Sequence, residues 1–114
     1  MKIPEQCKLL RVFIGENDKW HHSPLYEAIV LKARELELAG ATVLRGPMGF
    51  GAKSHLHTAK ILRLSSDLPM VIEIVDSEEK INRLLPHLDE MVSEGLVTLE
   101  DVRVIKYRSS SHEG

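Results

Sequence analysis

A glycine-rich segment with flanking cations is the part of this sequence best suited to bind an anion. The residues Arg45-Gly46-Pro47-Met48-Gly49-Phe50-Gly51 place three glycines within six positions, directly after an apolar stretch, and Lys53 follows. Glycine allows backbone N–H groups to approach a phosphate closely. The spacing matches neither a P-loop nor a dinucleotide-binding G-x-G-x-x-G motif. A glycine-rich turn that binds nothing is the commoner use of such a segment.

Two cations near the end of the sequence are a second candidate for anion binding. Lys106 and Arg108 are separated by one residue, so in a strand their side chains would point to the same side. Paired cations suit a diphosphate or triphosphate. A solvated strand end is an equally good interpretation of these two residues.

Histidines and acids offer a weaker basis for catalysis or metal binding. His55 and His57 would lie on one side of a strand, but no Asp or Glu occurs among residues 44–66 to complete a metal site. Cys7 has no nearby base, and no G-x-S-x-G motif occurs. We therefore predict no enzyme and no metal. A small metal- or anion-binding module, or a small hydrolase using loop histidines, stays open as an alternative. The enzyme alternative would use His21, His22, His55 and His57 with Glu16 or Asp18.

Composition narrows the classes of function. The 114 residues are 43% hydrophobic and 28% charged, with a formal net charge of −2, so we expect no nucleic-acid partner. The single cysteine excludes an intramolecular disulfide and favours a reducing compartment. No apolar run approaches the roughly 20 residues of a membrane span, and no signal peptide is apparent. These features predict a soluble cytoplasmic protein with no direct membrane insertion.

Alternating strand and helix signals predict the fold that would position these residues. Apolar, β-branched stretches indicate four strands, and two amphipathic segments indicate helices. The order is βαββαβ, which predicts an α+β, ferredoxin-like sandwich: a four-stranded antiparallel sheet with both helices on one face. We predict one domain over residues 1–108 and a flexible tail over 109–114. The expected strands are 8–15, 41–45, 70–75 and 102–107.

The helix boundaries follow from capping residues. Ser23-Pro24 predicts the start of the first helix and Gly40 its end. Asp76 predicts the N-cap of the second helix, with Glu79 as its capping-box partner. Gly95 would end that helix, and Pro86 inside it predicts a kink or a break.

Period-two alternation predicts which strand residues the helices cover. The purely apolar set should lie under the helices: Leu10, Val12, Ile14, Leu44, Met70, Ile72, Ile74, Val102 and Val104. The opposite set is also mostly apolar, which is unusual for a solvated face and predicts a subunit interface. Cover by the protein's own 46–67 loop is the alternative. We expect Glu73 to pair with Arg11 across adjacent strands. The predicted interface residues are Leu9, Arg11, Phe13, Val43, Val71, Glu73, Val75, Arg103 and Ile105.

Several motifs together resemble the PII nitrogen-regulatory signalling proteins. The stretch AGATVLRGPMGFGAKSHLHT is similar to their second strand and the start of their T-loop, and EIVDSEEKINRLLPHLDEMVSEG to their third strand and second helix. Over residues 8–108 the chain looks like an uncharacterised PII-like family. Members of that family carry G-E-N/x-D, P-L-Y-E-A-I and A-G-A-T-V-L-R-G-x-x-G-F-G, here residues 15–18, 24–29 and 39–51.

The resemblance implies a homotrimeric, non-enzymatic signalling protein with its sheets facing inward. It implies an adenine nucleotide (ATP, ADP or AMP) in the clefts between subunits. The 46–67 loop would report to a regulated protein such as a membrane transporter or an enzyme. The implied nucleotide-binding residues are Arg45, Gly49, Phe50, Gly51, Lys53, Lys106 and Arg108.

The chain also departs from the PII pattern. Ala52-Lys53 replaces an Arg-Gln, and Gly95-Leu96-Val97-Thr98 replaces a Gly-Asp-Gly-Lys that supplies a phosphate lysine. No tyrosine lies within 46–67, so tyrosine uridylylation there is excluded.

Overall fold

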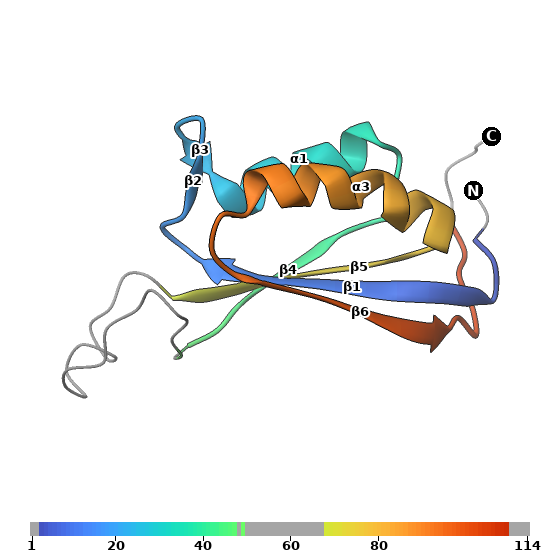
Figure 1. The fold of residues 1–114 in the computed structure, drawn as a ribbon. Coiled ribbons are helices and arrows are strands. Elements are labelled where there is room, and N and C mark those ends of the chain that lie inside the picture. Colours follow the sequence, from blue (N-terminus) through green and yellow to red (C-terminus); the bar gives the residue numbers. More distant parts are fainter. Residues whose placement is uncertain (1–2, 48, 50–67, 110–114) are drawn as a thin grey trace.

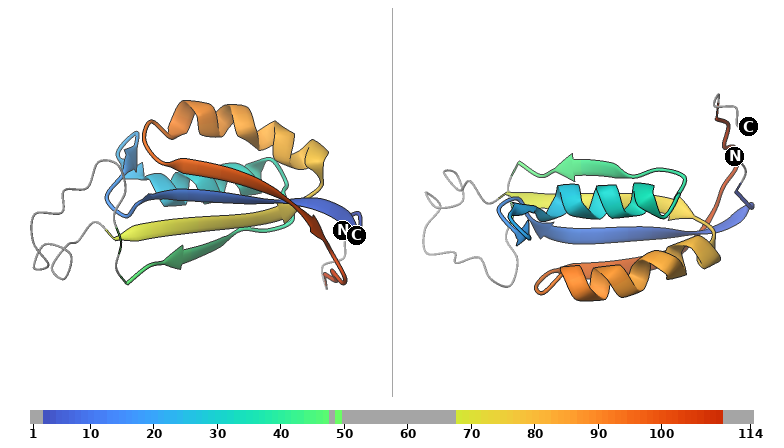
Figure 2. Two further views of the ribbon diagram at one scale, coloured as in Figure 1. Left: turned by 60° about the horizontal axis from the view of Figure 1, so that its bottom comes forward. Right: turned by 90° about the horizontal axis from the view of Figure 1, so that it is seen from above.

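A four-stranded antiparallel sheet carries two helices on one face (Figures 1 and 2). The computed structural model describes residues 3–47, 49 and 68–109. The sheet order is β4-β5-β1-β6, so the first and third long strands are neighbours at its centre. This confirms the predicted α+β, ferredoxin-like arrangement. The elements are β1 (Gln6–Gly15), β2 (Lys19–Trp20), β3 (Ser23–Pro24), α1 (Leu25–Glu35), β4 (Thr42–Arg45), β5 (Pro69–Asp76), α3 (Glu78–Met91) and β6 (Leu96–Arg103).

The core lies between the sheet and the two helices. Val12 of β1 and Ile72 of β5 are opposite each other in the register, and both are fully buried. They pack with the inward-facing residues of both helices, including Ile29 of α1 and Ile81 of α3. Burial of each such side chain contributes about 1.5–3 kcal/mol to folding. The faces predicted for the strands that became β1 and β5 are therefore confirmed.

Strand β4 is turned over relative to the prediction. Val43 lies opposite the buried Ile72 and packs against the core, whereas Leu44 lies opposite Val71 on the other face and is 49% exposed. The predictions that Val43 lies on the interface face and that Leu44 lies under the helices are therefore both wrong. Arg45 lies opposite Met70, on the helix-covered side of the register.

Strand β6 begins earlier than predicted and ends at Arg103. Leu96 lies opposite Phe13, and Val102 lies opposite Cys7, on the face away from the helices. The prediction that Val102 lies under the helices is therefore wrong.

Arg103 and Ile105 also lie elsewhere than the interface prediction requires. Arg103 lies opposite Gln6 and forms an ion pair with Glu5, and its register position is on the helix-covered side. Ile105 lies beyond β6 and is 80% exposed. Neither residue therefore lies on the open face of the sheet beside Leu9 and Phe13, as the interface prediction requires.

The second helix is capped by Ser77 rather than Asp76. The Ser77 hydroxyl accepts a hydrogen bond from the backbone N–H of Lys80 at 3.2 Å. The helix continues through Pro86 without a break. Both Pro86 and Asn82, whose carbonyl loses its helical partner, lie on the exposed side, where water can hydrogen-bond that carbonyl.

The first helix starts and ends differently from the prediction. Pro24 is its N-cap residue, with no side-chain hydrogen bond, and Ser23-Pro24 form the short strand β3. The helix ends at Glu35 because Glu37 adopts a left-handed conformation (φ 65°). The ammonium group of Lys80 donates a hydrogen bond to the Glu37 carbonyl at 2.7 Å. Gly40 therefore lies beyond the end of the helix.

Replacing Gly95 by alanine should lower the free energy of unfolding by about 1–3 kcal/mol. Gly95 joins α3 to β6, and a Cβ there would lie 2.7 Å from the Phe13 carbonyl oxygen, closer than such contacts allow. Gly40→Ala is the matched control, because no atom lies within 4 Å of a Cβ at that position. Urea unfolding of both variants measures the difference. Equal stability of the two would contradict the close approach at Gly95.

Candidate functional site

The glycine-rich segment leaves the sheet where β4 ends and β5 begins. The Gly46 N–H donates a hydrogen bond to the Pro69 carbonyl at 2.8 Å, so the two flanks of the intervening segment are joined. A Cβ at Gly46 would lie 2.8 Å from the Pro69 ring, and one at Gly49 would lie 3.0 Å from it. A side chain at Gly46 would therefore clash with Pro69, and one at Gly49 would press tightly against the same ring. Phe50, Gly51 and Lys53 lie outside the described residues.

Glu16 connects the same two flanks to the end of β1. Its backbone N–H donates to the Leu68 carbonyl at 2.8 Å, and its carboxylate pairs with the Arg45 guanidinium at 3.3 Å. The Arg45 side chain is 58% exposed and that of Glu16 is 24% exposed. The guanidinium can therefore meet a ligand from solvent, while the carboxylate is partly enclosed.

The turn that holds Glu16 is fixed by Asp18. The nearly buried Asp18 carboxylate accepts the Gly15 N–H at 3.0 Å, and the Asp18 carbonyl accepts the Leu25 N–H at 2.8 Å. This turn ties the end of β1 to the start of α1. An acid–base role predicted for Glu16 or Asp18 is not favoured by these contacts, because both carboxylates already bind protein donors.

Lys106 and Arg108 lie at the opposite end of the sheet. Gly15 is opposite Pro69 at one end of β1, whereas Gln6 is opposite Arg103, the last residue of β6, at the other. In Figure 1 the arrowhead of β6 points away from the end where β5 begins. The ten residues of β1 separate the two ends by about 30 Å. One copy of the chain therefore does not bring these cations to Arg45.

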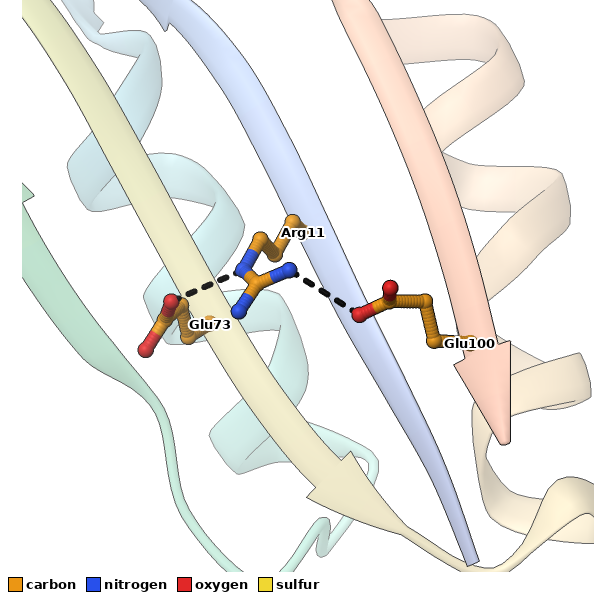
Figure 3. Close-up of polar contacts among 3 residues, drawn as sticks. All are labelled: Arg11, Glu73 and Glu100. Atoms are coloured by element: carbon orange, nitrogen blue, oxygen red, sulfur yellow. Dashed lines mark hydrogen bonds and ion pairs between the residues drawn. The ribbon is translucent and has the colours of Figure 1, made fainter. Parts of the chain in front are cut away.

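The open face of the sheet centres on Arg11 (Figure 3). Its Nε donates to Glu73 of β5 at 2.9 Å, and its Nη1 donates to Glu100 of β6 at 3.0 Å. The hydrogen bond to Glu73 raises the pKa of Arg11, and the Glu100 charge adds to this, so the guanidinium stays charged. The predicted pair of Arg11 with Glu73 is confirmed. Sequence reasoning missed Glu100, because the strand that carries it was expected to start later.

Apolar side chains surround this charged cluster. Leu9 and Phe13 flank Arg11 on β1, and Val71 and Val75 flank Glu73 on β5, all half-buried. Leu96 continues this row on β6 and is 55% exposed. A contiguous apolar patch of this kind is typical of a surface that another protein surface covers.

The histidines that suggested metal or hydrolase chemistry do not form a site within the part of the chain that the structure describes. His21 and His22 form the left-handed turn of the β2–β3 hairpin, with φ of 49° and 72°. The Trp20 ring stacks on His21 with centroids 4.1 Å apart. His55 and His57 lie outside the described residues. Among those described, no three His, Cys, Asp or Glu side chains are grouped as metal ligands would be.

Cys7 does not provide a nucleophile in this arrangement. Its side chain is buried, and the thiol donates a hydrogen bond to the Pro4 carbonyl at 3.0 Å. Burial raises the pKa of the Cys7 thiol, and the nearby charge of Asp76 raises it further. The thiol form, which is the less reactive one, is therefore favoured.

Comparison with known proteins identifies the family. The family model DUF190, described as "Uncharacterized ACR, COG1993", matches residues 7–104. The chain belongs to the DUF190 family. A UPF0166 protein of Aquifex aeolicus is 43% identical to this DUF190 chain over 98 residues, covering 86% of the chain and 92% of the relative. A UPF0166 protein of Methanocaldococcus jannaschii is 37% identical over 102 residues, covering 89% and 94%.

Solved structures relate this DUF190 chain to PII-like proteins by fold. CPII, a nitrogen regulatory PII-like protein from Thiomonas intermedia bound to ADP, AMP and bicarbonate, aligns with a TM-score of 0.64 at 16% identity, covering 90% of this chain and 97% of CPII. The GlnK–ATP complex of B. subtilis aligns with a TM-score of 0.57 at 12% identity, covering 89% and 85%. The predicted relation in fold to the PII proteins is therefore confirmed. In the described residues no helix is long and apolar enough to cross a membrane.

Proposed function

We propose that this protein is a PII-like regulatory protein that binds an adenine nucleotide between copies of the chain. The nucleotide, ATP, ADP or AMP, controls contact with a protein partner, a transporter or an enzyme, through segment 46–67. Three observations support the proposal: the shared fold, the ADP and AMP of CPII, and the ATP of GlnK. The role that we propose for the protein is regulatory, in the cytoplasm, and not catalytic.

The observation that carries the proposal is the position of the candidate phosphate-binding groups. Arg45 and the Gly46 and Gly49 backbone occupy one end of the sheet, and Lys106 and Arg108 follow its other end. Contact between unlike ends of successive copies is a heterologous association, which closes into a ring when the rotation from one copy to the next is a whole fraction of a turn. A homotrimer with the Arg11 face inward satisfies both this requirement and the need to cover the apolar patch.

Nucleotide binding by the wild-type protein and by Arg108→Ala tests the proposal. Calorimetry should detect ATP or ADP binding, and Arg108→Ala should weaken it about ten- to hundredfold through loss of one charge-assisted hydrogen bond. Arg83→Ala is the control, because Arg83 lies on α3 and pairs only with Glu79 among the contacts of the described residues. A wild-type protein that binds none of the three nucleotides would contradict the proposal.

Complementation between variants tests whether the site is shared by two copies. Arg45→Ala and Arg108→Ala should each bind nucleotide weakly in a pure oligomer. In oligomers refolded from an equal mixture, about one quarter of the clefts would combine an intact Arg45 with an intact Arg108 and recover wild-type affinity. A mixture with no recovered sites would place both arginines in the same copy's site or outside the site.

A further inference from the structure

The two residues of the Glu16–Arg45 ion pair differ in how firmly they are held: Glu16 is anchored, whereas Arg45 can move. The Glu16 backbone is held by its N–H to the Leu68 carbonyl and by the turn that Asp18 fixes, and the Glu16 side chain is partly enclosed. Arg45 is the last residue of β4, and more than half of its side chain is exposed. The guanidinium can therefore leave the carboxylate by side-chain rotation, without any change in the sheet.

A phosphate would compete with Glu16 for the same group. Carboxylates and phosphates both accept hydrogen bonds from a guanidinium, and arginine binds either with the same planar set of donors. Arg45 directly precedes Gly46 and is close to Gly49, where the backbone approaches Pro69 without side chains. An anion seated at this turn would therefore lie within reach of the guanidinium and close to the Glu16 carboxylate, which would repel it.

We propose that Glu16 is an internal competitor for Arg45: a ligand phosphate displaces its carboxylate, and Glu16 thereby determines how strongly affinity depends on ligand charge. This inference rests on the proposed function, since it assigns the phosphate end of the same site. Glu16 acts as a positioning and specificity residue through Arg45. Glu16 lowers the affinity for every anion. It lowers the affinity most for the ligand that places the largest negative charge at the Arg45 guanidinium.

Glu16→Gln separates this competition from the structural role of the residue. Glutamine keeps the backbone N–H that binds Leu68 and nearly the same side-chain shape, but it has no charge to hold the guanidinium. We expect Glu16→Gln to bind ATP about two- to fivefold more tightly than wild type, the range expected from losing an exposed ion pair. The gain should decrease from ATP to ADP to AMP.

Two controls make the effect specific to Arg45. Glu79→Gln removes the same charge from the exposed Glu79–Arg83 pair on α3, and nucleotide affinity should not change. In an Arg45→Ala background the Glu16→Gln gain should be smaller, because the guanidinium for which Glu16 competes is absent and only the direct repulsion of the anion by Glu16 is relieved. A gain of undiminished size in that background would indicate a general charge effect and overturn the proposal, as would Glu16→Gln affinities equal to or below wild type.

An inorganic probe separates failure of this inference from failure of the proposed function. Tripolyphosphate is titrated against the melting temperature of wild type and Glu16→Gln. If no adenine nucleotide binds wild type, the proposed function fails. The competition is then still supported if tripolyphosphate stabilises Glu16→Gln at lower concentrations than wild type, and overturned if the two respond alike or not at all.

Discussion

Replacing Arg11 by methionine should prevent the proposed assembly of copies and lower the free energy of unfolding by about 3–5 kcal/mol. Arg11 is the cation that neutralises Glu73 and Glu100 at the centre of the open sheet face. Methionine keeps apolar bulk but leaves the carboxylates on either side of it, Glu73 and Glu100, without their cation. If other copies cover this face, both charges are buried without a partner, which is strongly unfavourable.

The measurement is light scattering together with urea unfolding at two protein concentrations. Arg83→Met is the matched control, because its pair with Glu79 is solvent-exposed on α3 and should contribute no more than about 0.5 kcal/mol. Glu73→Gln should cost less than Arg11→Met, since Arg11 keeps its bond to Glu100. An Arg11→Met protein with unchanged size and stability would mean that the face is open to water.

Replacing Asp76 by alanine should cost about 2–5 kcal/mol of unfolding free energy. The Asp76 side chain is buried, and its two oxygens accept the backbone N–H groups of Ala39 at 2.8 Å and Ser77 at 2.7 Å. Alanine would leave both donors without their acceptor in a partly buried part of the structure. The same change would also release the connection after α1 from the start of α3.

Urea unfolding of Asp76→Ala measures this cost. Asp76→Asn should fall between alanine and wild type, because an amide keeps one acceptor oxygen. Glu90→Ala, at an exposed position on α3, is the control and should change stability by less than about 0.5 kcal/mol. A loss for Asp76→Ala no larger than that of the control would show that these two backbone bonds contribute little to folding.

Sequence patterns predicted the central strands well and the edge strands poorly. In β1 and β5 apolar and charged residues alternate around Arg11 and Glu73, so only one face assignment is possible. In β4, Val43 and Leu44 are both apolar and adjacent, so alternation alone gives no face. Pairing with β5 decides it, because Thr42 lies opposite Glu73.

The last strand was misplaced because its stabilising contacts are distant in sequence. Glu100 and Asp101 have low strand propensity and made the stretch before Val102 look like a loop. In the fold, Glu100 pairs with Arg11 and Asp101 with Lys8, both on β1. Those ion pairs span some ninety residues, and only the sheet order brings them together.

The candidate site was predictable in its residue types but not in its geometry. The sequence indicated Arg45 and the glycines as an anion site, and the close packing of Gly46 on Pro69 explains why glycine stands there. It did not indicate that Arg108 lies at the far end of the sheet, because that separation follows from the direction of β6. The contact of Glu16 with Arg45 joins a turn to a strand end 29 residues later, which no local pattern signals.

The hydrogen bond from Gly46 to Pro69 affects which changes in chain length the fold can tolerate. Gly46, after the end of β4, is hydrogen-bonded to Pro69, at the start of β5. The sheet is therefore complete without the stretch between these two residues. Doubling the length of such a stretch costs only about 0.6 kcal/mol of loop-closure entropy. Changes in the length of this stretch therefore cost little folding free energy, whereas substitutions at Gly46 or Pro69 would disturb the strands that these residues join.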